Sequence, residues 1–293
     1  MRLRECSHSF RIYVKSVILK PVDLSMRSTI TERCFQMYQI DLRGKNALVF
    51  GVANEHSIAW SIARLLKEAG ANLILAYQNE RFGRRVSNLV SSMDNVSLVE
   101  CDVSKDESIQ GTFETIKDSF GKLDIVVHSV AYAGREDLQG NFSETDRENF
   151  AMSLDISAYS LISILRYAGP MMEDGGSVIA MTFHASEKVY PGYNVMGTAK
   201  AALENIVRQL SSEFGKDDIR VNAISAGPLE TLAARGISGF PDMKHVHAER
   251  APLKRNITHD EVGKVGLFLC SDLSSGVTGS VIYVDAGFNI MAI

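Results

Sequence analysis

The stretch Asn46-Ala-Leu-Val-Phe50-Gly51-Val-Ala-Asn-Glu-His-Ser57-Ile58 decides the fold. Its first five residues form a short apolar run, which predicts a buried strand, and Gly51 permits a tight turn directly after it. Ser57 stands where the N-cap of the next helix is expected. The apolar residues that follow it share one helical face, at positions 58, 62, 65, 66 and 69. A strand, a turn and a helix in this order are typical of the first unit of an α/β domain.

The rest of the chain repeats this alternation of short apolar runs with helical patterns. Further strands are expected at residues 72–76, 96–100, 125–129, 177–181, 221–225 and 277–284, and further helices at residues 106–120, 144–167 and 203–214. Because the strands are apolar almost throughout, both faces of their sheet are expected to be buried under helices. We therefore predict a single-domain, Rossmann-like, doubly wound parallel sheet of about seven strands, without repeats or a second domain.

The composition argues against several classes of function. The chain has 293 residues, of which 45% are hydrophobic and 23% charged, and this fits one sizeable globular domain. A formal net charge of −4 gives no electrostatic case for nucleic-acid binding. The four cysteines are scattered without a Cys-x-x-Cys pair, which argues against disulfides or a metal site and favours a cytoplasmic location. No apolar run approaches the ~18 residues that a membrane span needs.

The first 36 residues differ from the rest because they carry seven Lys and Arg residues and lack the strand–helix alternation. A targeting peptide, a disordered arm, and a non-native extension ahead of a start at Met26 or Met37 all fit this stretch. Acidic residues at 5, 23 and 32 count against targeting. We favour Met37, since the sequence after it leads straight into the first strand. The expected organisation is an N-terminal extension over residues 1–36 and a domain over residues 37–293.

Ligands of doubly wound sheets bind beyond the carboxyl ends of the strands, so residues that directly follow strands are candidates for a site. Gly51, Ser57 and Ile58 could place helix N–H groups against a pyrophosphate. An ordinary capped turn fits equally well, because only one glycine of G-x-G-x-x-G is present. Gln78 can hydrogen-bond a ribose diol, and no Arg or Lys follows it immediately, which favours NADH over NADPH despite arginines at 81, 84 and 85. Asp102, followed by Val103, could accept from an adenine amino group or cap a turn.

A second motif, Tyr193-Asn-Val-Met-Gly-Thr-Ala-Lys200, follows the fifth strand. Short-chain dehydrogenases commonly carry Tyr-x3-Lys, whereas this Tyr-x6-Lys resembles the signature of bacterial enoyl-acyl-carrier-protein reductases. The resemblance extends through Ser129-Val130-Ala131, residues 220–233 and residues 268–287, and it covers nearly the whole chain from about residue 40. It implies an enzyme that uses NADH/NAD to reduce the trans-2 double bond of enoyl thioesters on acyl carrier protein in fatty acid biosynthesis. It also implies a homotetramer.

The spacing of the motif suggests how the two groups divide the work. Seven residues are almost two helical turns, so Tyr193 and Lys200 are expected on one helical face, ~10 Å apart along the axis. That separation suits Lys200 to the nicotinamide ribose hydroxyls and leaves Tyr193 to donate a hydrogen bond to the thioester oxygen. The resemblance implies the same roles, and it places Val130, Leu229 and Thr231 at the cofactor.

One position departs from the resemblance. Many bacterial members have a second tyrosine ten residues before the catalytic one, where this chain has Phe183. Phenylalanine cannot donate a hydrogen bond, so Phe183 is expected to shield the nicotinamide from water. His184 and Tyr190 are alternative donors, although a loop histidine is more often a surface residue.

The segment 229–250 mixes glycines with apolar residues, which suits a mobile lid over an acyl chain but also fits a plain surface loop with a short helix. Residues expected to line the substrate end are Ala133, Tyr193, Met196, Ile237 and Phe240. Acyl carrier proteins are acidic, so a basic rim is expected from Lys244, Arg250, Lys254 and Arg255, interrupted by Asp242.

Two other functions fit the same sequence. A reductase of this fold could act on enoyl-CoA, a ketone or an alcohol, but the seven-residue step from Tyr193 to Lys200 argues against the ketone. A non-catalytic binding scaffold is the second, and the presence of both residues argues against it.

Overall fold

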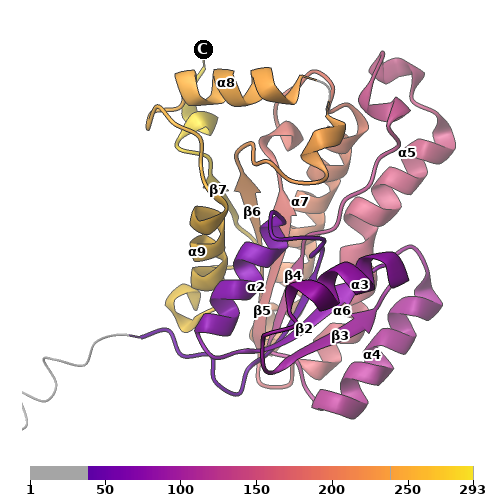
Figure 1. Cartoon of the computed structure of the whole chain (residues 1–293), viewed down its shortest axis with the longest axis vertical. Coiled ribbons are helices and arrows are strands. Elements are labelled where there is room, and N and C mark those ends of the chain that lie inside the picture. The colour runs from indigo at the N-terminus through magenta and orange to yellow at the C-terminus, as the bar shows by residue number, and fades with distance from the viewer. Residues whose placement is uncertain (1–38, 238, 293) are drawn as a thin grey trace, which may run out of the picture. The chain divides into compact units, whose positions relative to one another are not determined.

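Seven parallel strands form one sheet in the order β3-β2-β1-β4-β5-β6-β7 (Figure 1). The strands are β1 Asn46–Phe50, β2 Asn72–Tyr77, β3 Val96–Glu100, β4 Ile125–His128, β5 Gly176–Thr182, β6 Ile219–Ala226 and β7 Val281–Val284. The computed structural model describes residues 39–237 and 239–292, so the extension expected over residues 1–36 lies outside the described residues. The predicted doubly wound parallel sheet is confirmed.

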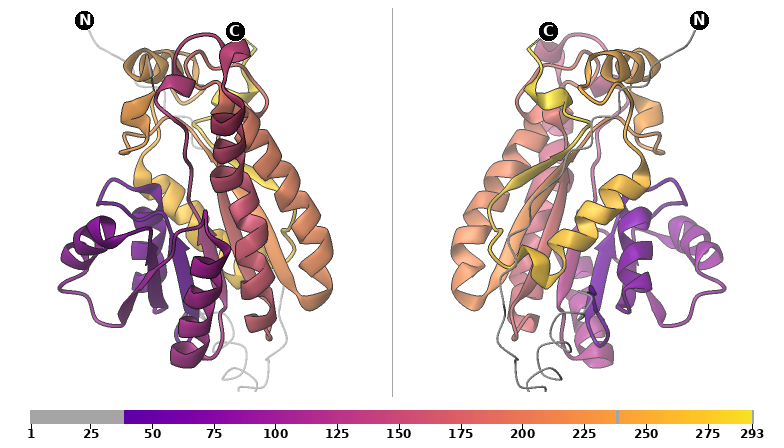
Figure 2. Two further views of the ribbon diagram at one scale, coloured as in Figure 1. Left: turned by 90° about the vertical axis from the view of Figure 1, so that its right-hand side faces the viewer. Right: turned by 90° about the vertical axis from the view of Figure 1, so that its left-hand side faces the viewer.

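Helices cover both faces of the sheet, as the two views in Figure 2 show. They are α2 Ile58–Glu68, α3 Glu80–Leu89, α4 Asp106–Phe120, α5 Arg147–Leu154, α6 Ser160–Ala168, α7 Val195–Phe214, α8 Phe240–Arg250 and α9 His259–Leu269. Alternate residues of β1 enter separate cores, because side chains of a strand alternate between its faces. Ala47 and Val49 pack with α2, α3 and α9, while Leu48 and Phe50 pack with α4, α6 and α7. The apolar pattern of the strands is thus explained by burial on both sides.

The helix predicted over residues 144–167 is present, and it contains a π-helical turn. α5 ends at Leu154, a π-helical turn runs over Asp155–Tyr159, and α6 begins at Ser160. Two serines of this region are bonded to the loop and strand beside them instead of facing water. Ser157 Oγ accepts from Tyr132 N at 2.9 Å, and Ser160 Oγ lies 2.7 Å from His128 Nε2. The long helical stretch is confirmed, and only its π-helical turn was not predicted, because these contacts join segments far apart in the sequence.

Three further differences are local. Neither α3 nor α9 is among the helices predicted from the sequence. The buried residues of α3 are only Gly83 and Val86, and so short a buried stripe gives little periodic signal. The last strand begins at Val281 and not at residue 277, because residues 277–280 turn against β6. In that turn, Asn222 Nδ2 donates to Val277 O at 2.8 Å.

Over the described ranges, no helix is long and apolar enough to cross a membrane. Cys101 and Cys270 are buried free thiols, and Cys6 and Cys34 lie outside the described residues. Nor do the described His, Cys, Asp and Glu side chains gather in threes as they would around a metal ion.

Gly51 joins β1 to the loop beyond it and allows the backbone after β4 to pass close by. Its φ is +95°, and a Cβ placed there would lie 2.1 Å from the carbonyl oxygen of Ser129. We expect Gly51→Ala to lower the free energy of unfolding by well over about 1 kcal/mol, because both the backbone conformation and the contact become strained. Urea titration of the purified variant checks this.

The matched control for this substitution is Gly111→Ala in α4, where no heavy atom lies within 4 Å of the new Cβ. There the same change should raise the free energy of unfolding by about 0.5–1 kcal/mol, since alanine is the better helix former. Equal effects of the two substitutions would contradict the role assigned to Gly51.

Candidate functional site

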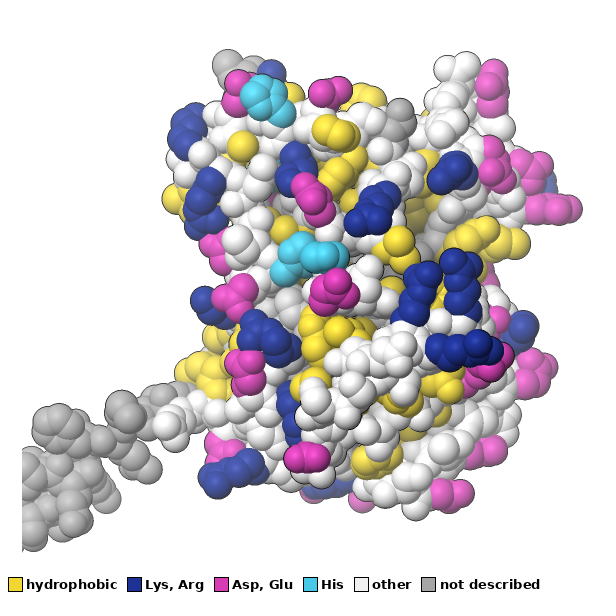
Figure 3. Space-filling view, in the orientation of Figure 1, with side chains coloured by type: hydrophobic (Ala, Val, Ile, Leu, Met, Phe, Trp, Pro, Cys, Tyr) yellow, Lys and Arg dark blue, Asp and Glu magenta, His cyan; other side chains and the backbone are white. Residues whose placement is uncertain are grey.

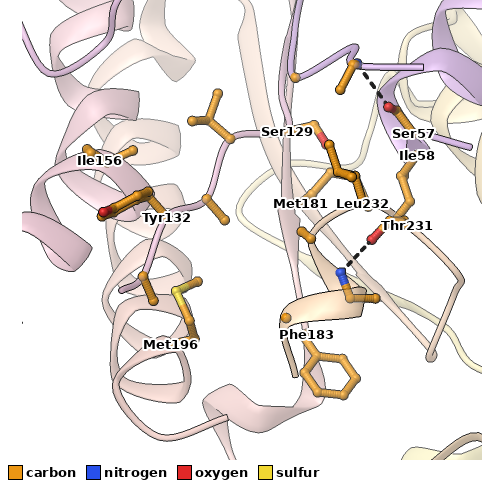
Figure 4. A pocket seen from close by; sticks show the side chains of 18 of the residues that line it. Ser57, Ile58, Ser129, Tyr132, Ile156, Met181, Phe183, Met196, Thr231 and Leu232 are labelled. Carbon is orange, nitrogen blue, oxygen red and sulfur yellow. Dashed lines mark hydrogen bonds between the residues drawn. The ribbon is translucent and has the colours of Figure 1, made fainter. Parts of the chain in front are cut away.

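A cavity of about 820 Å³ opens at the carboxyl ends of β1 to β6. The sheet order reverses between β1 and β4, and doubly wound sheets bind ligands at such a reversal. Figure 4 shows Tyr132, Ile156 and Met196 on one side of this cavity, and Ser57 and Thr231 on the other. Every residue that the sequence analysis assigned to cofactor, substrate or catalysis lines it, so the structure brings the whole candidate set together.

Ser57 takes the N-cap position of α2, but its side chain makes no capping bond to the helix. Its Oγ instead accepts from Ala53 N at 3.0 Å and Asn54 N at 3.2 Å, which fixes the loop between β1 and α2. In the first turn of α2, the N–H groups of Ile58 and Ala59 have no intrahelical acceptor. Gly51, this loop and the free helix N–H groups fit the pyrophosphate of a dinucleotide.

Gln78 and Asp102 line the part of the cavity beyond β2 and β3. Asp102 holds its own turn, as one of the two sequence interpretations expected, because its Oδ1 accepts from Ser104 N at 3.2 Å and from Ser104 Oγ at 2.8 Å. Partial burial acts to raise the pKa of the Asp102 carboxyl, but these bonds and Lys105 lower it below its usual range. An ionised carboxylate therefore faces the cavity beside the uncharged Gln78.

Tyr193 does not lie on the helix that carries Lys200. α7 begins only at Val195, and Asn194 before it has a φ of +36°. Tyr193 sits in the preceding turn, where its N–H donates to Tyr190 O and its carbonyl accepts from Met196 N. The shared helical face predicted from the spacing is therefore wrong, because Tyr193 precedes the helix. Both side chains nevertheless line the same cavity.

Lys200 is a buried ammonium at the floor of the cavity, with 5% of the residue exposed. Its Nζ donates to Met181 O at 2.8 Å. Burial lowers the pKa of Lys200 to about 8, although Glu204 acts to raise it. Burial also raises the pKa of the Tyr193 phenol above its usual range, so this hydroxyl is a proton-bearing donor at neutral pH. The site thus combines a neutral hydrogen-bond donor with a cation near its titration point.

Phe183 packs between two tyrosines. Its ring centre is 4.7 Å from that of Tyr190 and 5.0 Å from that of Tyr193, which it meets edge to face. His184 is buried, contrary to the expectation of a surface loop. Its Nδ1 lies 3.1 Å from the Tyr190 hydroxyl. Phe183 lines the cavity, whereas His184 and Tyr190 do not. Neither alternative donor is therefore placed to act on a ligand there.

The segment 229–250 contains a short 3₁₀ turn at Ala234–Gly236 and the helix α8. Residues of this segment up to Met243, among them Ile237 and Phe240, cover one side of the cavity. The segment is therefore more than the plain surface loop that was the alternative interpretation.

The expected basic rim is not a uniform patch. Lys244 pairs with Glu230, Arg255 binds both oxygens of Glu261, and Lys254 Nζ donates to the carbonyl of Glu249. Figure 3 likewise shows acidic and basic side chains interspersed on this face. These pairings join residues five to fourteen positions apart, and the positions of the basic residues by themselves do not reveal them.

Sequence reasoning missed several residues of the cavity. Arg135 lines it from the loop after β4, and Arg235 lines it from the 3₁₀ turn at Ala234–Gly236. Ile156 lines it from the π-helical turn. Arg135 follows β4 in the same loop as Ala133, so its place after a strand was a usable signal. No local signal marks Ile156, because its direction depends on the π-helical turn between α5 and α6.

His128, at the end of β4, is fully buried behind the site. Burial, with a contribution from the charge of Lys200, lowers its pKa to about 3. Its Nδ1 has no hydrogen-bond partner among the described residues. His128 is therefore neutral near pH 7.

The chain matches a family model described as enoyl-(acyl carrier protein) reductase over residues 51–289. It is 50% identical over 255 residues to the NADH-dependent enoyl-[acyl-carrier-protein] reductase of Nostoc sp., which covers 86% of this chain and 99% of the relative. The corresponding Bacillus subtilis protein is 46% identical over 253 residues, with 86% and 98% covered.

Solved structures agree with these relatives. The Bacillus cereus enoyl-acyl carrier protein reductase, in complex with NADP⁺ and indole naphthyridinone, has a TM-score of 0.85 and 44% identity, covering 87% of this chain and all of that one (100%). The reductase of Anaplasma phagocytophilum, in complex with NAD, has a TM-score of 0.84 and 42% identity, with 87% and 98% covered. The similarity therefore extends to both fold and sequence.

The buried neutral His128 links stability to pH. Below the ordinary histidine pKa of 6.5, the unfolded chain takes up a proton that the folded chain refuses until about pH 3. The contribution of this residue to the free energy of unfolding is thus full above pH ~6.5. It falls as the pH is lowered, by about 2 kcal/mol at pH 5. Urea unfolding at pH 7.5 and 5, at one protein concentration, measures this loss.

His128→Asn should reduce the loss between the two pH values by about 2 kcal/mol relative to the parent chain. His245→Gln, at an exposed site of α8, is the control and should leave the loss unchanged. The same pH dependence in all three proteins would refute the assignment.

Proposed function

This chain belongs to the family of enoyl-(acyl-carrier-protein) reductases, and from that premise we propose that its cavity reduces the trans-2 double bond of enoyl thioesters with NADH. The protein is an NADH-dependent oxidoreductase of fatty acid biosynthesis. The observation that carries the proposal is that Tyr193 and Lys200 line one cavity together with the loop from Gly51 to Ser57. That arrangement brings a phenol donor and a dinucleotide into the same space.

When bound, the reduced nicotinamide supplies the hydride that adds to the β-carbon of the double bond. This chain's residues hold the dinucleotide. The N-terminus of α2 faces its pyrophosphate, Gln78 bonds the adenosine ribose diol, and the Lys200 ammonium bonds the nicotinamide ribose hydroxyls. The buried place of Lys200 beside Met181 O supports this role, because its remaining donors are left for a ligand in the cavity.

Tyr193 acts on the substrate. Addition at the β-carbon moves negative charge onto the thioester oxygen, and a donor already aimed at that oxygen stabilises the charge. The high pKa of the phenol keeps its proton in place for this hydrogen bond. Phe183 holds the Tyr193 ring edge to face and closes that side of the cavity to water. A thioester bound in the cavity would have its oxygen against the Tyr193 hydroxyl.

The finer assignments extend the same proposal. The thioester is carried by an acyl carrier protein, residues 37–293 form the working domain, and the segment 229–250 is a lid over the acyl chain. The enzyme works in the cytoplasm as a homotetramer. Exposed Met152 and Tyr159, beside a groove between α5 and α7, support a surface that another copy covers.

A panel of thioesters tests the proposed function. Trans-2-enoyl-acyl carrier protein should consume NADH faster than trans-2-enoyl-CoA of the same chain length, while a ketone should give no turnover. The loss of reduced-cofactor absorbance, with NADH and NADPH in parallel, measures each rate. Failure to reduce any enoyl thioester would overturn the proposal and favour a binding scaffold.

Tyr193→Phe removes the hydroxyl but keeps the ring that packs on Phe183. We expect turnover to fall by roughly a hundredfold or more, since losing one such donor costs about 3–4 kcal/mol in the transition state. NADH binding, measured by fluorescence titration, should stay within about twofold, because the cofactor contacts are untouched. Near-normal turnover in this variant would contradict the role of the phenol.

A further inference from the structure

Behind the cavity, a buried carboxylate accompanies the buried ammonium. Lys200 and Glu204 lie one helical turn apart on α7, and only 5% and 4% of the two residues are exposed. Both contact the end of β5, because Lys200 Nζ donates to Met181 O and Glu204 Oε1 accepts from Thr182 Oγ1 at 2.7 Å. One strand end therefore holds the two charges on one face of the helix.

The two residues differ in their access to a ligand. Lys200 lines the cavity, and Met181 O is its one hydrogen-bond acceptor among the described residues, so its other N–H groups are available to the cavity. Glu204 does not line the cavity. Burying a carboxylate at this depth costs free energy, and the single hydrogen bond from the Thr182 hydroxyl offsets little of that cost. Glu204 can affect a ligand only through Lys200.

We propose that Glu204 is a positioning residue that acts through Lys200 as its counter-charge, keeping the ammonium charged for the dinucleotide. This inference rests on the proposed function, in which the cavity binds NADH. The carboxylate lies at i+4, where its charge acts on the ammonium through the protein interior while the Met181 carbonyl fixes the direction of the side chain.

The other titratable groups facing this pair do not supply the charge. His128, on β4, is kept neutral by a pKa of about 3. Burial lowers the pKa of His184 below its usual value, and burial together with Glu187 raises the pKa of the Tyr283 phenol, so both stay uncharged near pH 8. Burial lowers the pKa of Lys200, and Glu204 is the group that acts to raise it.

Glu204→Gln tests the proposal, because the amide has the same size and still accepts from Thr182. The affinity for NADH is measured by fluorescence from pH 6 to 9.5. In the parent chain it should fall as pH rises through about 8, where Lys200 loses its proton. In the variant this fall should come about one pH unit lower, so that binding is about fivefold weaker at pH 8 and within about twofold at pH 6.

Glu213→Gln is the matched control, since it makes the same chemical change at an exposed position of α7. It should leave the pH midpoint unchanged, and Glu204→Asp, which keeps the charge, should largely restore it. An unshifted midpoint in Glu204→Gln would overturn the proposal. Equal weakening at every pH would overturn it too, because it would indicate a merely structural role.

Labelling of the cofactor-free protein separates this inference from the proposed function. Acetic anhydride modifies only deprotonated lysine, and mass spectrometry reads the extent at Lys200. At pH 7 the modification rate of Lys200 should be about fivefold higher in Glu204→Gln than in the parent, and equal rates would refute the counter-charge. Unchanged NADH affinity in Lys200→Ala would refute the ligand assigned to Lys200 and leave the labelling result standing.

Thr182→Val provides a second variant should Glu204→Gln not fold. It removes the hydrogen bond that the Glu204 carboxylate accepts from Thr182, so the carboxylate is no longer held in its place one turn from Lys200. The Lys200 midpoint should shift to lower pH by a smaller amount, and no shift would count against the proposal.

Discussion

The reversal of strand order between β1 and β4 is the constraint on which the site depends. The two strands pair in parallel from Ala47 with Ile125 to Phe50 with His128, so their carboxyl ends reach the same edge of the sheet. The chains leaving them turn to opposite sides, which opens the cavity. Gly51 allows that pairing to continue to the edge, because its missing side chain leaves room for the Ser129 carbonyl.

Because both faces of the sheet are buried, the polar groups beneath the cavity lie in surroundings of low dielectric constant. Charges placed there titrate far from their usual values, as Lys200 and His128 do. The same burial makes every polar group in the floor depend on a partner, such as Met181 O for Lys200 and Ser160 for His128. Stability and function are therefore joined in one set of contacts.

The wall of the cavity is set by a different kind of packing. Phe183 lines the cavity and contributes an aromatic ring and no hydroxyl. His184 and Tyr190 bond each other behind it, so the polar atoms of this loop point away from the cavity. Tyr193 is then the phenol that the loop presents to a ligand, and its ring is supported from the side by Phe183.

The sequence by itself determined the order of strands and helices, the parallel sheet and the residues that gather at its edge. These follow from short apolar runs and from residues placed directly after strands, which are local signals. Only the tertiary structure decided that a π-helical turn lies within the helix before β5 at Asp155–Tyr159, that Tyr193 stands outside α7, and that Lys244 and Arg255 are bound by acidic partners. The physical reason is that each of these depends on the course of the backbone in three dimensions, and neither periodicity nor spacing carries that information.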